Sequence, residues 1–478
     1  MPPRQYLVVF AQTHEDFRVP ELRSVAELYG FPLTIPHDFD KSRPFGVLAL
    51  DQEEHARFLA RRCILIKAVY EFYASGRSYE ELHEQNRSSR NLWEKYIPET
   101  SFKFVVNGYN HSISKARQRE VIEDFSYMGF MGKIDLVSPE ITMGYFEEYR
   151  DRDIHGTTSQ KHEGAAVFRE AFFGRLLEQG SARSLIKMFD VKKRQYFGNT
   201  SMEAEISLLM ANQTLASPGK LIYDPFIGTG SLAYTTAHFG AFVFGSDIDG
   251  RQMRGKETKP GILRAATQYG VRERILDLCT FDITRNPWRC GGLFDCDHHR
   301  SSVVPPIRLP HRNPARKRHH TGICDQLRHP FAREDQPYLP PTKPYELSAL
   351  AADLVVLARY LLNPGGRLVF FLPTVIDEYK ELDLDSMLCD GMEVVRELAA
   401  GFRCLITIRK STSVAYPPPT FDPQVAHGGS GSSGIDHDGE DASPASPVHA
   451  HVPAHRDFRE KYFQGFKPKK PSSEEFDT

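Results

Sequence analysis

Residues 221–249 place glycines and carboxylates in an order that suits nucleotide binding. An apolar run at 221–223 ends in Asp-Pro-Phe and a Gly-Thr-Gly turn, and a helix-compatible stretch follows at 232–240. A second apolar run at 241–245 leads into two aspartates. We therefore predict a strand, a glycine loop, a helix and a second strand, which together form the first half of a Rossmann-like site.

The residues around the glycine loop restrict the class of ligand. No Gly-Lys-Ser/Thr follows the loop, and Ala233 stands where a dinucleotide enzyme usually has its third glycine. The carboxylate of Asp224 would face the ligand, so the loop suits a molecule with an amine and without a pyrophosphate. S-adenosylmethionine (SAM) has that charge. The alternative is a purely structural strand–turn–helix in another α/β enzyme.

The composition describes a soluble protein with substantial cores. The chain has 478 residues, of which 40% are hydrophobic and 26% are charged, enough for two to three domains. The net charge is −2, so any nucleic-acid affinity must come from local basic patches. Seven cysteines without a C-x-x-C pair predict reduced thiols and no zinc ribbon. With no signal-peptide pattern and no long apolar window, we expect a cytoplasmic protein without a membrane anchor.

Changes in composition predict the organisation of the chain. In the N-terminal part we expect a strand at 6–10 and helices at 19–28, 56–73 and 165–190. The expected parts are an N-terminal region at 1–155, a connecting helix and linker at 156–195, a Rossmann-like domain at 196–418, a disordered linker at 419–455 and a basic, aromatic tail at 456–478.

Several motifs together resemble one family. They are YFGNTSMEAE (196–205) followed by SLLMANQ, the DPFIGTGS loop, and YLPPTKPYELSALAADL (338–354). They are similar to the catalytic subunit of the eukaryotic tRNA (guanine-N2-)-methyltransferase that acts on guanosine 10. Residues 101–136 resemble the THUMP-containing segment of that family.

The resemblance implies a fold, a reaction and partners. The fold would be α/β, with a Rossmann-like SAM-dependent methyltransferase sheet and an N-terminal α+β domain that contains THUMP and binds tRNA. The reaction would transfer a methyl group from SAM to the exocyclic amine of guanosine 10. The partners would be tRNA and a small zinc-binding activator subunit in a heterodimer.

The resemblance also implies roles for individual residues. Thr200 or Ser201 could alternatively be a plain N-cap of the helix expected at 202–213. Of the two aspartates at the second strand, we prefer Asp247 for the ribose because it is nearer the strand end. No catalytic residue and no metal ligand is assigned. The implied cofactor contacts are Asn199, Thr200 and Ser201 at the methionine end; Asp224, Pro225, Phe226, Gly228 and Gly230 around the methionine moiety; Asp247 or Asp249 at the ribose; and Asp282 at the adenine amine.

The catalytic loop expected of an amino-methyltransferase is missing from the sequence. Such enzymes carry Asp/Asn-Pro-Pro-aromatic after the fourth strand, where a carboxylate or amide oxygen and a backbone carbonyl accept the N–H bonds of the target amine. The aromatic side chain stacks on the extruded base. Here the motif should follow residues 291–295, but residues 296–334 contain six histidines and eight Lys/Arg instead. We expect no strand in this segment and a gap where the fourth strand belongs.

Three interpretations of residues 296–334 remain open. The segment could be a basic RNA-binding insertion. It could be a metal site, although its Cys and His spacing follows no ligand pattern. It could also be translated out of frame, because shifting the codons for Cys296 to Ser302 by one base can encode Ala-Ile-Ile-Thr-Asp-Pro-Pro. We favour the third interpretation, with 296–337 as the anomalous stretch.

Two other functions compete with the tRNA guanine-N2 methyltransferase. An N6-adenine methyltransferase of DNA or RNA would share the same SAM half-site, but the THUMP-like N-terminus argues against it. A catalytically dead tRNA-binding protein would explain the missing loop. Resequencing the transcript across codons 285–340 discriminates between an enzyme and a dead binder.

Overall fold

The computed structural model describes residues 4–150, 167–198, 201–255, 261–283, 285–294, 302–303, 347–373, 385–400 and 403–421. The chain forms two compact units. The N-terminal unit consists of Met1–Arg194 together with Met202–Leu215, and the C-terminal unit of Gln195–Ser201 together with Ala216–Thr478. The expected parts at 419–455 and 456–478 lie outside the described residues, except for the first three residues of the former.

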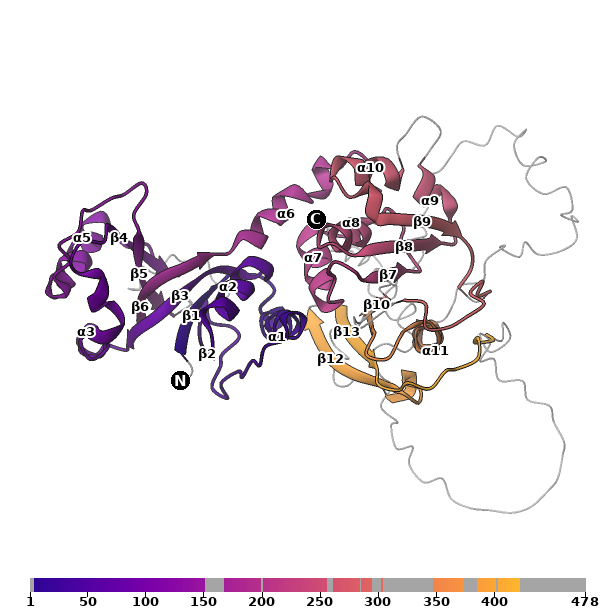
Figure 1. The fold of residues 1–478 in the computed structure, drawn as a ribbon, viewed down its shortest axis with the longest axis horizontal. Helices are drawn as coiled ribbons and strands as arrows, with labels where there is room; N and C mark the ends of the chain where they lie inside the picture. The colour runs from indigo at the N-terminus through magenta and orange to yellow at the C-terminus, as the bar shows by residue number, and fades with distance from the viewer. Residues whose placement is uncertain are drawn as a thin grey trace, which may run out of the picture. The chain divides into compact units, whose positions relative to one another are not determined.

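A six-stranded sheet with the order β2-β1-β3-β6-β5-β4 is the centre of the N-terminal unit (Figure 1). Neighbouring strands are antiparallel except for the parallel pair β4 and β5. The strands are β1 (Arg4–Phe10), β2 (Phe45–Leu50), β3 (Ile66–Gly76), β4 (Phe102–Tyr109), β5 (Ile141–Tyr149) and β6 (Phe168–Gln179).

The helices of this unit other than Leu185–Met188 pack on one face of the sheet. Alternate residues of β1, such as Tyr6, Val8 and Phe10, form one core with apolar residues of two helices, because successive side chains of a strand point to opposite faces. A second core on β4, β5 and β6 buries Leu82 and Val121. The helices are α1 (Arg18–Tyr29), α2 (Glu53–Arg62), α3 (Tyr79–Ser88), α4 (Arg90–Trp93), α5 (Lys115–Asp124) and α6 (Leu185–Met188).

The other face of the sheet curls until its edge strands meet. The ring centroid of Phe45 on β2 lies 4.7 Å from that of Tyr109 on β4, although these strands are the two edges. The core on this face is built from strand residues such as Leu7, Tyr70 and Phe146. We call this side of the sheet the concave face.

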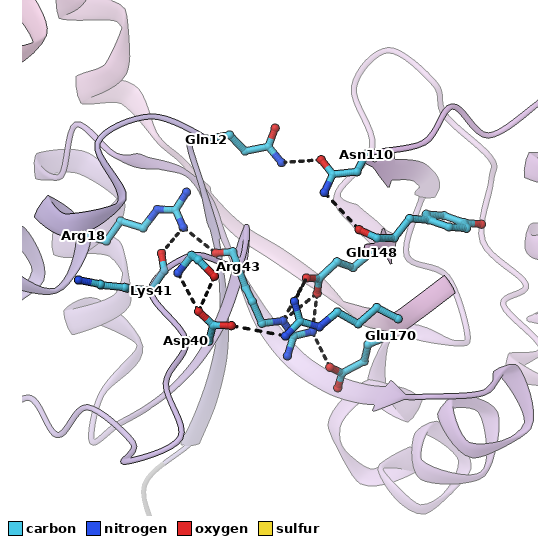
Figure 2. Close-up of polar contacts among 11 residues, drawn as sticks. Gln12, Arg18, Asp40, Lys41, Arg43, Asn110, Glu148 and Glu170 are labelled. Atoms are coloured by element: carbon cyan, nitrogen blue, oxygen red, sulfur yellow. Dashed lines mark hydrogen bonds and ion pairs between the residues drawn. The ribbon is translucent and has the colours of Figure 1, made fainter. Parts of the chain in front are cut away.

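An ionic network closes one end of the concave face. Figure 2 shows the Arg43 side chain beside the carboxylates of Glu148 and Glu170. The Arg43 guanidinium donates to Glu148 through Nε at 3.0 Å and to Glu170 at 2.6 Å. The buried Arg18 donates to the Arg43 carbonyl at 2.7 Å, which fixes the loop before β2. The network therefore joins this loop to β5 and β6.

Two expected helices are wrong in the N-terminal unit. The stretch 56–73 contains the end of α2 and most of β3, and the stretch 165–190 contains β6 followed by a 3-10 turn and α6. Both strands are central in the sheet, and neither alternates strictly between apolar and polar residues. The strand expected at 6–10 and the helix expected at 19–28 are confirmed as β1 and α1.

A seven-stranded sheet with the order β12-β13-β11-β10-β7-β8-β9 forms the C-terminal unit. The strands from β11 to β9 are parallel, and β12 and β13 form an antiparallel hairpin at the edge. This doubly wound arrangement confirms the expected Rossmann-like α/β fold. The strands are β7 (Leu221–Asp224), β8 (Phe242–Asp247), β9 (Ile275–Thr280), β10 (Ser302–Val303), β11 (Arg367–Pro373), β12 (Met392–Ala400) and β13 (Arg403–Lys410).

Four helices belong to this sheet. In α11, Ala351, Leu354, Val355 and Ala358 are buried at helical spacing and form a core with β11 and β13. The helices are α8 (Ser231–His238), α9 (Gly250–Arg254), α10 (Ile262–Gln268) and α11 (Leu347–Leu361). Across both units, none of the described helices has the length and apolar character that crossing a membrane requires.

The expected gap at the fourth strand is wrong. The two-residue strand β10 pairs in parallel with β7 and with β11, and so occupies the position between them. Phe294, shortly before β10, forms an isolated bridge to Leu362. Strand pairing uses backbone groups that every sequence except proline offers, so side-chain composition did not reveal it. The rest of 296–334 lies outside the described residues.

The helix α7 (Ala204–Gln213) packs within the N-terminal unit through buried polar side chains. Asn212 donates to Glu21 on α1 at 2.7 Å and accepts from Nε of Arg62, at the end of α2, at 2.7 Å. Glu21 also accepts from the backbone N–H groups of Ile64 and Leu65 at 2.7 and 3.0 Å. Three N–H donors therefore depend on one buried carboxylate.

The substitution Glu21→Ala should destabilise the N-terminal unit by about 2–4 kcal/mol, because three buried donors lose their acceptor. Arg23→Ala, on the exposed side of the same helix, should change stability by less than about 0.5 kcal/mol. The measurement is denaturation followed by tryptophan fluorescence. In a Trp288→Phe background the signal comes from Trp93, which is buried in this unit. Equal effects of the two substitutions would contradict the role of Glu21.

The same carboxyl group should make stability depend on pH. Burial raises the pKa of Glu21 to about 7, against the hydrogen bonds and the nearby Arg62, which lower it. The folded state then holds a proton that the unfolded chain releases near its ordinary pKa of about 4.3. The unfolding free energy of the wild type should therefore fall from about pH 4.3 to about pH 7, relative to Glu21→Ala.

Candidate functional site

The glycine loop between β7 and α8 requires glycine at two positions. Gly228 and Gly230 have φ angles of 52° and 80°, in the left-handed region that other residues rarely adopt. A Cβ atom on Gly230 would also lie 2.8 Å from the ring of Tyr234. The Gly230 N–H donates to the Ile227 carbonyl at 2.7 Å, which closes the turn. The loop therefore presents bare backbone at the start of α8.

Three carboxylates gather at the carboxyl edge of the parallel strands. Asp224 ends β7 and is buried, Asp247 ends β8, and Asp282 follows β9. The register pairs Asp224 with Gly245 and Asp247 with Thr280, so the three strands end at the same edge. In open α/β sheets this edge is where ligands bind.

The two aspartates after β8 have different hydrogen-bond partners. Asp247 accepts from the Gly228 N–H at 2.9 Å through one oxygen and from the Asp249 N–H at 2.9 Å through the other. Asp249 is the N-cap of α9, where it accepts from the Arg251 N–H at 3.1 Å and pairs with its guanidinium at 2.9 Å. Asp247 therefore contacts the glycine loop, while Asp249 caps a helix. Which of them binds a ribose stays a prediction.

Ser201 lies beside the glycine loop although it is far from it in sequence. Its hydroxyl is 2.8 Å from that of Thr229 and accepts from the Gly198 N–H at 3.0 Å. The helix α7 has Glu203 as its N-cap, so Ser201 does not cap it. Asn199 and Thr200 lie outside the described residues.

The turn after β7 is fixed by its own side chains. Asp224 accepts from the Phe226 N–H at 3.0 Å. Pro225 is buried, and its carbonyl lies 3.4 Å from the Ser246 hydroxyl on β8. Phe226 is half-buried and packs against the core of the C-terminal unit. Pro225 and Phe226 therefore hold the loop in place through packing.

Reasoning from the sequence missed two residues that stabilise the loop, Tyr234 and Thr229. The Tyr234 hydroxyl donates to the Thr229 carbonyl at 2.9 Å, so its ring supports the loop from below. The spacing of four residues from Gly230 could have suggested this contact. Thr229 bonds to Ser201, and no local signal predicts a contact between segments 28 residues apart.

Comparisons with known proteins place the chain in a family. Residues 4–182 match the family model described as the Tmrp11 THUMP N-terminal domain. The tRNA (guanine(10)-N(2))-methyltransferase of Saccharomyces cerevisiae is 35% identical over 381 residues, which cover 78% of this chain and 85% of the yeast protein. The Schizosaccharomyces pombe protein of the same name is 31% identical and covers 96% of both chains.

Among solved structures, TrmN from Thermus thermophilus aligns with a TM-score of 0.39 and 17% identity, covering 85% of this chain and 99% of that one. The fold assignment rests instead on the strand order and the glycine loop described above. Together with the extent and identity of the sequence matches, these features lead to one conclusion: the chain belongs to the tRNA (guanine(10)-N(2))-methyltransferase family.

Proposed function

We propose that this protein transfers a methyl group from SAM to the N2 amine of guanosine 10 in tRNA. The observation that carries the proposal is the bond between Asp247 and the glycine loop, in a chain that is 35% identical to a protein named for this reaction. We further propose that the N-terminal unit binds the tRNA and that a small zinc-binding activator subunit completes the enzyme.

The donor set of the described site supports SAM as the cofactor. Gly228 and Gly230 have no side chain, so a ligand could approach the backbone at both positions. Asp224 could accept from the ligand's ammonium group, Asp247 from ribose hydroxyls and Asp282 from the adenine amine. Bound SAM supplies a methyl group activated by its sulfonium.

The chain's own residues orient this ligand in the proposal. Ser201, held by Thr229, would face the methionine end together with Asn199 and Thr200. Asp249 would act indirectly, because it caps α9 and donates its N–H to Asp247. The methyl group would then point to the end of β10, where an amino-methyltransferase needs acceptors for the two N–H bonds of the target amine.

The sequence does not supply those acceptors in the expected form. The Asp/Asn-Pro-Pro-aromatic motif is absent after Phe294, so we assign no catalytic residue. A catalytically inactive tRNA-binding protein is therefore the second candidate function. An N6-adenine methyltransferase is not favoured, because residues 4–182 match the Tmrp11 THUMP N-terminal domain model.

The substitution Asp247→Ala should weaken SAM binding by about 1–3 kcal/mol, which is the usual cost of losing a hydrogen bond to a charged acceptor. Asp249→Ala is the matched control, because it removes a helix cap and an ion pair next to the site. Titration calorimetry with SAM would measure both. A larger loss for Asp249→Ala would assign the ribose to that residue instead.

Methyl transfer should depend on the missing motif. The chain as printed should transfer no methyl group to tRNA, whereas a version with residues 296–334 replaced by the frame-corrected peptide should do so with the proposed activator subunit. The measurement is transfer of labelled methyl from SAM to a tRNA with guanosine 10. Inosine at that position is the matched control, because it lacks the N2 amine.

The outcomes of this assay separate the two parts of the proposal. Methylation by the printed chain would disprove the frame-shift explanation and leave the function standing. Replacing the restored aspartate by alanine should abolish transfer, because the amine would lose its acceptor. Failure of every version on guanosine 10 would overturn the proposed function.

A further inference from the structure

A cavity of about 260 Å³ opens on the concave face of the N-terminal unit. It is lined by residues of β1, β3, β4, β5 and β6, all of which belong to the same sheet. Small-molecule sites usually measure about 300–1,000 Å³, so this cavity is suited to one group about the size of a nucleobase.

The cavity and the ionic network lie next to each other along β5 on the concave face. Thr142 and Phe146 line the cavity, and Glu148, two residues further along the same face, bonds to Arg43. Figure 2 shows Arg43 beside the carboxylates of Glu148 and Glu170. On the neighbouring strand β4 the cavity lining extends from Lys103, which is paired with Thr142, to Tyr109, which is paired with Glu148.

A glycine in the middle of β5 makes room for the floor of the cavity. A Cβ atom on Gly144 would lie 2.4 Å from the ring of Tyr70 on β3. Without that atom, the Tyr70 ring can lie against β5. Only 5% of Tyr70 is exposed, and its hydroxyl has no hydrogen-bond partner among the described residues. A hydroxyl group that lines a cavity is suited to bind a ligand.

Aromatic and basic side chains surround this hydroxyl. Phe146 is buried beside Tyr109, which is half-buried and offers its ring to the cavity. The Lys67 ammonium lies 5.3 Å from the centre of the Tyr109 ring. Lys103, on β4 like Tyr109, also lines the cavity. The lining contains two lysines and no acidic residue, so it is suited to an anion next to an aromatic group.

The charged groups near Lys67 also favour binding of an anion. Burial lowers the pKa of Lys67, and the positive charges of Arg183 and Arg18 lower it further. A bound phosphate would relieve that repulsion.

We propose that the cavity binds one unpaired nucleotide of the RNA substrate, with its base against Tyr109 and Phe146 and its phosphate between Lys67 and Lys103. The Tyr70 hydroxyl would donate to an acceptor on the base, and the exposed Asn107 amide would contact its edge. Unpaired RNA bases are bound in this way, by stacking on aromatic rings while cations hold the backbone. The proposal rests on the proposed function, since it takes RNA as the substrate.

Two sets of variants separate the phosphate and base contacts. The pair Lys67→Gln and Lys103→Gln should weaken tRNA binding at least tenfold and reduce the salt slope of log K by about 1.4, the value for two contacts to single-stranded phosphates. Tyr109→Ala should weaken binding about 5- to 150-fold with an unchanged salt slope, because it removes only stacking. Lys95→Gln, an exposed lysine of the same unit outside the cavity, is the matched control and should change neither quantity.

The measurement is fluorescence anisotropy with labelled tRNA and the full chain at several salt concentrations. Crosslinking with 4-thiouridine-substituted tRNA should additionally yield peptides that contain Tyr109. Unchanged affinity in both cavity variants, with tRNA still bound by the wild type, would overturn the nucleotide site and leave the proposed function intact. Absence of tRNA binding by the wild type would overturn the proposed function itself. A variant that loses both tRNA binding and SAM affinity would be misfolded. In that case, crosslinking of the wild type at Tyr109 would test the nucleotide site, and its absence would overturn it.

Discussion

The hydrogen bond from the Gly228 N–H to Asp247 is the interaction on which the candidate site depends. It joins the tip of β8 to the glycine loop after β7 at 2.9 Å. The loop can reach this carboxylate because Gly228 adopts a φ of 52°, and Gly230 can lie on Tyr234 because it has no side chain. The geometry of the whole edge therefore follows from two backbone positions and one carboxylate.

The N-terminal unit depends on a similar arrangement of buried polar groups. Glu21 receives N–H groups from α7 and from the segment before β3, and Arg43 joins β2 to β5 and β6. Isolated buried charges are costly, so each is matched with several partners. The second of these networks lies on the concave face of a strongly curved sheet, next to the cavity on that face.

Regular local patterns allowed much of the C-terminal unit to be predicted from the sequence. The strand, loop, helix and strand of 221–249 were evident because Asp-Pro and Gly-Thr-Gly separate two apolar runs. The helices expected at 56–73 and 165–190 were wrong because the central strands β3 and β6 do not alternate strictly between apolar and polar residues. Gly174 and the aromatic residues beside it in β6 were the missed signals for a strand.

Contacts between distant segments could not be predicted from local patterns. The bond between Ser201 and Thr229, the pairing of β10 and the approach of Phe45 to Tyr109 all depend on the tertiary fold. The distinction between Asp247 and Asp249 also needed coordinates, because both follow the same strand. Only their hydrogen bonds show that one contacts the loop and the other caps α9.

The most direct test of the account is hydrogen exchange of the full chain with and without saturating SAM. If the edge of β7 and β8 binds the cofactor, exchange should slow in peptides covering 224–231 and 245–251, where the Gly228, Gly230 and Asp249 N–H groups lie. Peptides from the sheet of the N-terminal unit should exchange at unchanged rates. Unchanged exchange at 224–231 under conditions in which SAM is bound would contradict the account, because the cofactor would then occupy another site.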